Sequence, residues 1–370
     1  MDGQGVPDVV IIGAGIVGAA CAYYASKAGL TVTVVDRTGV SGGTTGAGEG
    51  NILVSDKSPG PELDLAVRSN RLWHAIGEEV HGIELEAKGG LVVTSSREEQ
   101  EALDILAAQQ RSAGVLAEQA VSLQDYEPHL AEDLVGGMYY PQDMQVQPML
   151  AAARLLRASG AEVRLGVTVT GVEPGKVLTD KGTIHADAIV NAAGVWAGEF
   201  GGLPVLPRRG FILVTSRQPE LVRHKVYAAG YVANVGSDAA DLQTSPVVEG
   251  TKAGSILIGS SRERVGFDES MSLPVLRILA AAAIRLFPKL AGVHIIRAYK
   301  GFRPYTPDHL PIIGADARVE GLYHACGHEG AGVGLAPITG RLIADQITGA
   351  EPEMDTSPFR PGRFADDVHV

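Results

Sequence analysis

The sequence contains very little cysteine: Cys21 and Cys326 are the two examples among 370 residues. Iron–sulfur clusters are held mainly by four cysteine thiolates, so this chain cannot supply the ligands of one by itself. Cys21 falls within a predicted helix, where a free cysteine packs as a small hydrophobic residue. We therefore expect a protein without a cluster of its own and with Cys21 in the core.

Positive charge is also scarce. The 31 lysines and arginines are outnumbered by 43 aspartates and glutamates, which gives a formal net charge of −12. A protein that binds nucleic acid or an anionic membrane surface usually carries the opposite balance. Neither partner is therefore expected, and an acidic small-molecule substrate would need its own local cation.

Long hydrophobic runs are missing, because glycines interrupt the apolar segment that begins at Val9. A membrane-spanning helix needs about 20 consecutive apolar residues. The first residues, Met1–Gln4, lack the basic segment that is typical of a signal peptide. These features predict a cytoplasmic location without a membrane span.

Fixed-period repeats, low-complexity tracts and obvious linkers do not occur in the sequence. A length of 370 residues suggests two domains or one large domain, and 45% hydrophobic with 20% charged residues is ordinary for a globular enzyme. The lack of a linker favours domains that are interleaved along the chain.

Residues 9–36 carry the clearest motif, a β-branched run followed by three glycines and an alanine-rich helix. Gly13, Gly15 and Gly18 suit a sharp turn, a close approach of a pyrophosphate to the backbone, and tight packing of helix on strand. The free N–H groups at the start of the helix would bind the phosphates. A second predicted strand ends in Asp36, whose carboxylate can accept hydrogen bonds from ribose hydroxyls. The segment predicts a dinucleotide-binding strand–helix–strand unit.

A second glycine-rich loop, CGHEGAGVGLAPITG, follows a predicted strand at Leu322–Ala325 and opens a helix that extends to Thr348. A second nucleotide unit would need another strand with an acidic end, but the residues after Gly349 are rich in proline and aspartate. We interpret the loop as a helix N-terminus that stabilises negative charge on another part of the same cofactor.

Between these loops the pattern predicts further helices and strands. The predicted helices are Glu62–Val80, Glu98–Ser112, Pro148–Ala158 and Leu273–Leu290, and the predicted strands are Gly89–Ser95, Glu162–Val172, Lys176–Thr179, Ala188–Val190 and Val293–Tyr299, with 205–265 mainly β.

Five ordered motifs give a specific resemblance: GAGIVGAACAYYASKAGLTVTVVD, SGGTTGAGEGN, VNAAGVWA, GFRPYTPDHLPIIG and GHEGAGVGLAPITG. The chain resembles the D-amino acid oxidase, glycine oxidase and sarcosine oxidase family of FAD enzymes. Within that family, the segments GHEGAG, VSDK and YPQDMQVQP are most similar to those of β subunits of bacterial D-hydroxyproline dehydrogenases, opine oxidases and hydrogen cyanide synthases.

The resemblance implies an α/β (α+β) fold. It has a Rossmann-like FAD-binding domain of the glutathione-reductase-2 type and an interleaved, mainly antiparallel β substrate domain. The FAD-binding domain would comprise residues 1–83, 144–205 and 299–370. The substrate domain would comprise 84–143 and 206–298.

The same resemblance implies a set of FAD-binding residues. They are Gly13, Ala14, Gly15, Ile16, Val17, Gly18, Asp36, Arg37, Gly43, Thr44, Thr45, Gly46, Val169, Ala193, Gly194, Trp196, Gly301, Gly330, Gly332, Val333, Gly334 and Leu335. Residues 43–46 could instead form a flexible surface turn, and Trp196 could be simple core. Sarcosine-oxidase-type members attach flavin through a cysteine near the position of Arg303, and this chain has none there, so noncovalent FAD is expected. No metal site is predicted.

For the substrate, Arg303 matches the family arginine that binds the amino acid carboxylate. A guanidinium holds a carboxylate with two parallel hydrogen bonds, although Arg303 could instead pair with a structural acid such as Asp308. His328 could be catalytic or simply hydrogen-bonded to backbone, and Glu329 could bind a substrate nitrogen or face a partner subunit. Tyr227, Tyr231 and Gln243 are further candidates for the pocket.

The predicted activity is FAD-dependent oxidation of an amino acid C–N bond by hydride transfer from Cα to flavin N5, which gives an imine. The first candidate substrate is a D-amino acid or a cyclic or secondary amino acid such as D-hydroxyproline. The alternative is an FAD-carrying β subunit of a heteromeric opine or glycine (cyanide-forming) dehydrogenase, active only with iron–sulfur or flavin partner subunits. A flavin hydroxylase is disfavoured because its further phosphate motif is not evident.

Overall fold

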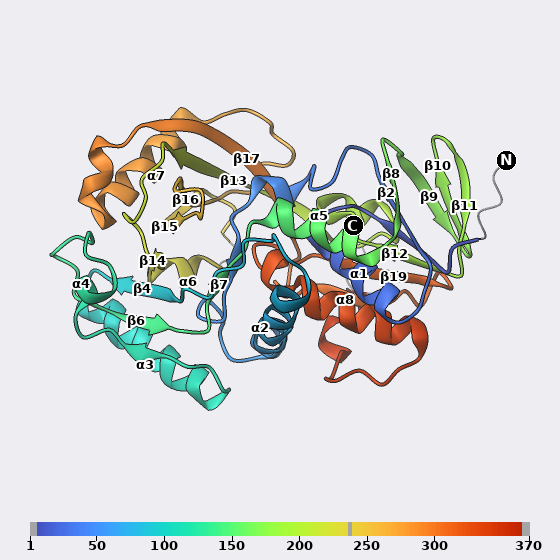
Figure 1. Cartoon of the computed structure of the whole chain (residues 1–370), viewed down its shortest axis with the longest axis horizontal. Helices are drawn as coiled ribbons and strands as arrows, with labels where there is room; N and C mark the ends of the chain where they lie inside the picture. The colour runs from blue at the N-terminus through green and yellow to red at the C-terminus, as the bar shows by residue number, and fades with distance from the viewer. Residues whose placement is uncertain (1–5, 236–238, 365–370) are drawn as a thin grey trace.

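The computed structural model describes residues 6–235 and 239–364. Met1–Gln4, on which the expectation about a leading segment rests, lies outside the described residues. Two β-sheets organise the molecule, each with its own helices, and the chain passes between them several times (Figure 1). In the part of the chain that is described, no helix combines the length and apolar character needed to cross a bilayer.

The first sheet has six strands from segments far apart in the sequence. Their order is β18 (Ile312–Ala315), β19 (Leu322–Cys326), β12 (Ala188–Asn191), β1 (Val9–Ile12), β2 (Val32–Asp36) and β8 (Glu162–Leu165). All neighbours are parallel except β18 and β19. The central strand β1 is completely buried, which explains its continuous run of apolar residues.

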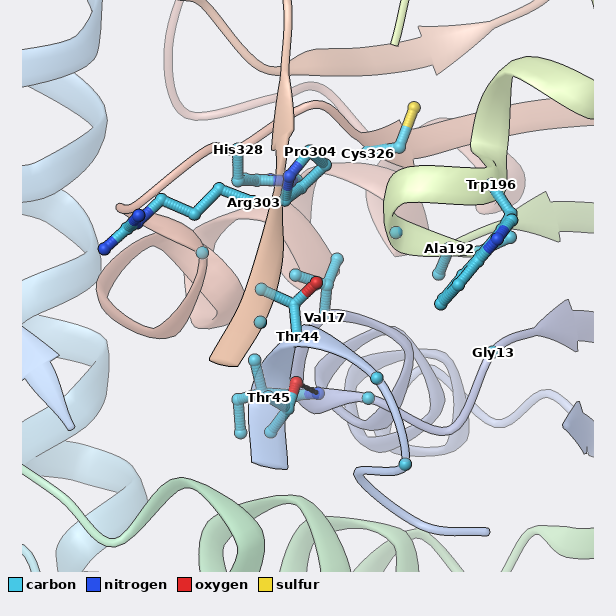
Figure 2. A pocket seen from close by; sticks show the side chains of 18 of the residues that line it. Gly13, Val17, Thr44, Thr45, Ala192, Trp196, Arg303, Pro304, Cys326 and His328 are labelled. Atoms are coloured by element: carbon cyan, nitrogen blue, oxygen red, sulfur yellow. Dashed lines mark hydrogen bonds between the residues drawn. The ribbon is translucent and has the colours of Figure 1, made fainter. Parts of the chain in front are cut away.

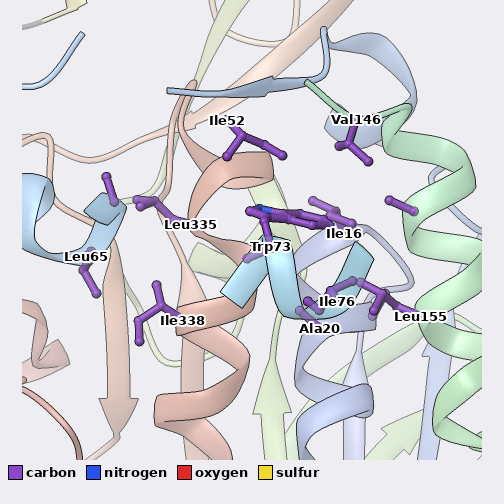
Figure 3. Packing of buried hydrophobic residues seen from close by; sticks show 14 of the residues in the cluster. Ile16, Ala20, Ile52, Leu65, Trp73, Ile76, Val146, Leu155, Leu335 and Ile338 are labelled. Atoms are coloured by element: carbon purple, nitrogen blue, oxygen red, sulfur yellow. The ribbon is translucent and has the colours of Figure 1, made fainter. Parts of the chain in front are cut away.

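Helices α1 (Ile16–Lys27), α2 (Pro61–Glu79), α5 (Pro148–Ser159) and α8 (Gly332–Thr348) pack together against this sheet (Figure 3). At Gly340 a Cβ would lie 2.5 Å from the backbone of Ala20, so glycine lets α8 approach α1 closely. The buried Trp73 indole N–H lies 3.1 Å from the carbonyl oxygens of both Val333 and Gly334. Trp73 therefore fixes the position of the first turn of α8.

A three-stranded antiparallel sheet packs against the same six-stranded sheet. It consists of β9 (Val169–Glu173), β10 (Lys176–Thr179) and β11 (Gly182–His185). The strand predicted over Glu162–Val172 is in fact two strands, because Gly166 adopts a left-handed φ of 64° after β8 and turns the chain out of the first sheet.

The second large sheet has eight strands and is mainly antiparallel. Its order is β17 (Ile295–Tyr305), β13 (Leu206–Thr215), β16 (Ile256–Arg262), β15 (Gln243–Gly250), β14 (Lys225–Ala228), β4 (Gly90–Thr94), β6 (Gly136–Tyr140) and β5 (Glu118–Gln119). Helices α3 (Arg97–Ser112), α4 (Leu123–Tyr126), α6 (Gly230–Val235) and α7 (Leu273–Leu286) accompany it (Figure 1).

Strand β17 joins the two parts of the molecule. It pairs with β13 from Ile295 to Tyr305, so the division of the chain proposed at residue 299 falls within this strand. Because β17 continues past Tyr299, it carries Arg303 to the region between the sheets. The helix predicted to reach Leu290 stops at Leu286, since Pro288 opens a separate 3-10 turn, η3 (Pro288–Gly292).

The shorter elements complete the connections. They are β3 (Asn51–Ile52) paired with β7 (Met144–Gln145), and the 3-10 turns η1 (Thr44–Ala47), η2 (Gly194–Glu199), η4 (Ser357–Phe359) and η5 (Pro361–Phe364).

Candidate functional site

A long cavity extends from the carboxyl end of β1 to the start of α8 and to β17 (Figure 2). Most of the residues proposed from the sequence line it: Gly13, Gly15, Ile16, Val17, Asp36, Arg37, Gly43, Thr44, Thr45, Val169, Ala193, Gly194, Trp196, Tyr231, Gly301, Arg303, His328, Glu329, Gly330, Gly332 and Val333. The proposed residues Ala14, Gly18, Gly46, Gly334, Leu335 and Gln243 are not part of its wall.

The turn between β1 and α1 forms the floor of the cavity. Gly13 has φ of 111°, and a Cβ there would lie 2.4 Å from the Ala192 carbonyl oxygen. A Cβ at Gly18 would lie 2.0 Å from the Gly13 carbonyl oxygen, so Gly18 permits the turn without reaching the cavity. The Thr45 hydroxyl accepts the Ile16 N–H at 3.0 Å. The start of α1 is thus held in place and directed at the cavity, where it favours a negatively charged group.

Asp36 helps to build the same turn. One carboxylate oxygen accepts the Ala14 N–H at 2.9 Å, and the other accepts the N–H and hydroxyl of Thr38 at 2.8 and 2.9 Å. A carboxylate has about four acceptor positions, so these bonds leave capacity for hydroxyl donors from a ligand. Asp36 therefore orders the loop and also faces the cavity.

Trp196 and Arg37 form one end of the cavity. The Arg37 guanidinium carbon lies 3.7 Å from the Trp196 ring centroid, and the Phe267 ring is stacked with Trp196 at 5.9 Å. Trp196 is half-buried and lines the cavity, so it is not the simple core residue that the sequence also allowed. This aromatic and cationic group offers a flat surface for a planar ligand group.

The loop at 43–46 lies under strand β17. The Thr44 hydroxyl donates to the Phe302 carbonyl oxygen at 2.6 Å, and a Cβ at Gly301 would lie 2.6 Å from the Ala47 Cβ. With Thr45 bound to Ile16, both threonine hydroxyls have partners. The loop is therefore packed between α1 and β17 and is not a free surface turn.

Helix α8 starts at the cavity wall. Its first turn contains no acidic residue, and Ala331 at its N-cap provides no side-chain hydrogen bond. The first N–H groups of the helix can therefore be satisfied by a ligand with partial negative charge.

Arg303 lies at the end of the cavity opposite Trp196, and its side chain points away from Trp196 (Figure 2). Its Nη1 donates to the Ser261 carbonyl oxygen at 2.8 Å. Asp308, the acid proposed as an alternative partner, is instead bound by Arg363 at 2.6 Å. Burial and the neighbouring charge of Arg262 lower the pKa of Arg303, but a guanidinium remains protonated in proteins.

Glu329 is part of a buried ionic network. Arg208 Nη1 donates to it at 2.7 Å, and His309 Nδ1 lies 3.3 Å from its other oxygen. Burial by itself would raise the pKa of Glu329, but the His309 hydrogen bond and the charges of Arg262 and Arg208 lower it to about 2. Gln243 contacts Arg208 Nη2 at 3.0 Å, so it supports this network from outside the cavity wall.

His328 is buried and contacts the Thr339 hydroxyl at 2.9 Å. Burial lowers its pKa to about 3, so the imidazole is neutral near pH 7. The alternative interpretation was a hydrogen bond to backbone, whereas the partner is a side-chain hydroxyl of α8.

Tyr231 lines the cavity, while Tyr227 lies behind it with the two rings 5.2 Å apart. Tyr227 is fully buried and its hydroxyl is hydrogen-bonded to Ser55. Tyr231 is therefore part of the cavity wall, whereas Tyr227 packs behind Tyr231 and does not line the cavity.

Sequence reasoning missed three charged residues of the region: Glu49, Arg208 and Arg262. Glu49 lines the cavity and its Oε1 has no hydrogen-bond partner among the described residues. Burial raises the pKa of Glu49. Glu49 stood within the quoted motif SGGTTGAGEGN, where an acid among small residues was an available signal, whereas Arg208 and Arg262 lie in no motif.

The described ranges contain no cluster of three or more histidine, cysteine, aspartate or glutamate side chains suited to a metal ion. Cys21 and Cys326 are both buried, and burial raises the pKa of each thiol to about 12.

Comparison with known proteins gives consistent matches over nearly the whole chain. The model of the family described as FAD dependent oxidoreductase (DAO) matches residues 8–346. Hydrogen cyanide synthase subunit HcnC of Pseudomonas aeruginosa is 33% identical, with 96% of this chain and 96% of that protein covered. Glycine oxidase of Pseudomonas putida is 31% identical, with 95% and 98% covered.

A solved structure of a protein named glycine oxidase has the same fold as this chain. The crystal structure of glycine oxidase from Geobacillus kaustophilus superposes with a TM-score of 0.88 at 27% sequence identity, covering 99% of this chain and 100% of that one. The mixed α/β architecture described above is the fold of that structure.

Proposed function

The chain belongs to the DAO family of FAD-dependent oxidoreductases. From this premise we propose that it oxidises the C–N bond of a small amino acid or imino acid and converts the bond to an imine. FAD, the cofactor of the family, would supply the acceptor for the hydride that leaves the substrate carbon, while the nitrogen loses a proton to solvent. The proposed substrate is an amino acid with a D configuration or a secondary amine, D-hydroxyproline being the first candidate from the sequence.

The long cavity fits FAD in its chemistry. Gly13 and Gly15 leave the backbone open where a pyrophosphate would approach the start of α1, and Asp36 presents a carboxylate to ribose hydroxyls. Residues Arg37 and Trp196 would hold the adenosine end, while the N–H groups at the start of α8 would face the flavin. No cysteine stands near Arg303 in the sequence, and burial raises the pKa of the Cys326 thiol in the cavity wall to about 12, which disfavours the reactive thiolate and supports noncovalent binding.

One observation supports the amino acid substrate most strongly, and it is the position of Arg303. Its guanidinium is anchored through Nη1 to Ser261, and the side chain extends from β17 at the end of the cavity away from Trp196. A substrate carboxylate bound there would be held by charge-assisted hydrogen bonds that also fix the orientation of its Cα.

The surrounding side chains support that orientation. Tyr231, His328 and Glu329 are each at least about nine-tenths buried and form the wall beside Arg303. His328 is neutral and Glu329 is neutralised by Arg208, so neither opposes the carboxylate strongly. A closed wall also keeps water away from the bond that reacts.

The test is anaerobic mixing of the purified FAD-bound protein with a panel of D-, L- and N-alkyl amino acids, followed through the loss of flavin absorbance. Arg303→Ala should lower kcat/KM by about 10- to 100-fold, because a charge-assisted hydrogen bond contributes about 1.5 to 3 kcal/mol. Arg297→Ala, which removes an exposed arginine from the same strand, is the matched control. Failure of every amino acid to reduce the flavin would contradict the proposal.

A second candidate function is supported by the relatives named hydrogen cyanide synthase subunit HcnC. The chain would then act as the FAD-carrying subunit of a heteromeric dehydrogenase and pass electrons to an iron–sulfur or flavin partner. Fast reduction of an artificial dye with slow peroxide formation would support this dehydrogenase, whereas rapid peroxide formation by the chain alone would support an autonomous oxidase. The cytoplasmic location also remains a prediction.

A further inference from the structure

A second arginine lies next to the proposed carboxylate-binding residue. Arg262 is the last residue of β16, and it directly follows Ser261, whose carbonyl oxygen accepts Arg303 Nη1 at 2.8 Å. The Arg262 guanidinium carbon lies 4.9 Å from the centroid of the Tyr231 ring. The charge of Arg262 is also a cause of the lowered pKa of Arg303. The two guanidinium groups are therefore close enough to repel one another.

Arg262 is buried, and part of its guanidinium has no hydrogen-bond partner in the described parts of the chain. Its residue exposure is 3%, and among the described residues its Nε and Nη1 have no hydrogen-bond partner. Buried charges are ordinarily paired, because an unpaired charge away from water is costly. A buried arginine with unsatisfied donors indicates a place for an anion that completes the site.

Two of the neighbouring acids already have partners, and Glu49, whose Oε1 has no hydrogen-bond partner among the described residues, lines the first cavity but not the cavity that contains Arg262. Glu329 binds Arg208 and His309, and Asp56 binds Lys57 at 2.7 Å. Glu62 also borders this region, but burial raises its pKa. Within residues 6–235 and 239–364, Arg262 therefore forms no ion pair of its own, although its charge acts on Glu329.

A second cavity, lined by Arg262, lies beside the first. Tyr231, His328, Glu329 and Gly330 line both cavities, while Arg303 lines the first and Arg262 lines the second. The two cavities are therefore adjacent, with Arg303 in the wall of one and Arg262 in the wall of the other.

We propose that Arg262 binds a second carboxylate of the substrate, so that the chain acts on dicarboxylic amino or imino acids. This inference rests on the proposed function and specifies its substrate class. Arg303 and Arg262 would each hold one carboxylate, with the nitrogen between them. A monocarboxylic cyclic amino acid such as hydroxyproline would leave Arg262 without its anion.

The test uses a pair of unreactive ligands in which sulfur replaces the nitrogen. Thiodiacetate carries two carboxylates, whereas methylthioacetate carries a methyl group in place of one carboxymethyl arm. Their dissociation constants are measured from changes in the flavin absorption spectrum of the FAD-bound protein. The wild-type protein should bind thiodiacetate about 10- to 100-fold more tightly, the range typical of one charge-assisted carboxylate contact.

Variants assign that preference to Arg262. Arg262→Gln should abolish it, Arg262→Lys should retain part of it, and Arg297→Gln should leave it unchanged. FAD content and thermal unfolding show whether each variant is folded. If Arg262→Gln does not fold, the wild-type preference and the Arg262→Lys variant still decide the result.

The outcomes also separate this inference from the function on which it rests. Equal binding of the two ligands by the wild type, or an unchanged preference in Arg262→Gln, overturns the role of Arg262. If monocarboxylic amino acids reduce the flavin and the Arg262 variants do not alter that reaction, the amino acid oxidation stands and the dicarboxylate preference fails. If no amino acid reduces the flavin and neither ligand binds, both fail.

Discussion

Lys225 and Glu249 form a buried ion pair between β14 and β15, with exposures of 1% and 2%. Replacement of Lys225 by methionine keeps the length of the side chain but leaves the Glu249 carboxylate buried without its cation. Removing one partner of a buried pair typically costs about 3 to 5 kcal/mol in the free energy of unfolding. We expect a loss in this range for Lys225→Met.

The matched variant is the double replacement Lys225→Met with Glu249→Leu. It removes both charges, and replacing a buried pair by apolar residues is often neutral or stabilising. The double variant should therefore be more stable than the single variant, although it removes more of the native contacts.

Urea denaturation followed by circular dichroism measures the free energy of unfolding of the three proteins. Equal stability of the wild type and Lys225→Met would refute the reasoning, as would a double variant that is less stable than Lys225→Met. Because Lys225 also lowers the pKa of Glu49 in the cavity wall, the single variant should raise that pKa further.

Three further predictions concern other parts of the molecule. Burial raises the pKa of Asp143 to about 7 from a usual value of 3.8, so the folded state binds the Asp143 proton more tightly than the unfolded state does. The stability that this proton contributes is lost as the pH rises from about 4 to about 7. Asp143→Asn should therefore gain stability relative to the wild type between about pH 4 and pH 7, and a parallel pH dependence in urea titrations would refute this. Gly340→Ala should destabilise by about 1 to 3 kcal/mol through overpacking against Ala20, while Gly292→Ala, with no atom within 4 Å, should not. Trp196→Ala should weaken FAD binding by about tenfold through loss of a ring surface and its cation–π partner Arg37, as measured by recovery of flavin fluorescence; unchanged affinity would exclude Trp196 from the binding site.

The sequence predicted best what depends on neighbouring residues. The glycines and β-branched residues at 9–18 produce β1, the turn and α1 at the expected places, because each step is a local consequence of backbone conformation. The second glycine loop opens α8 as predicted for the same reason. Helix and strand ends were less accurate, as at Leu286, where a proline ended the helix early.

The sequence could not place charged residues whose role depends on pairing between distant strands. Arg262 and Gln243 are opposite one another in β16 and β15, yet Arg262 lines a cavity and Gln243 supports Arg208. Which side a strand residue faces follows from sheet register, and a one-residue change reverses it. Composition and spacing do not set that register here, because a bulge interrupts the pairing between Thr244 and Val247.

The six-stranded sheet has a consequence for the way the protein is made. Its central strand β1 is the first to be synthesised, but its neighbour β12 starts at Ala188, and the sheet receives β19 only at Leu322. The other neighbour, β2, follows β1 closely in the chain, but synthesis runs at about 5 to 20 residues per second, so β1 waits many seconds for its second partner, β12. Helix α8, which completes the cavity wall, begins at Gly332. The nascent chain therefore cannot capture its cofactor in a finished site until nearly all of the protein has left the ribosome.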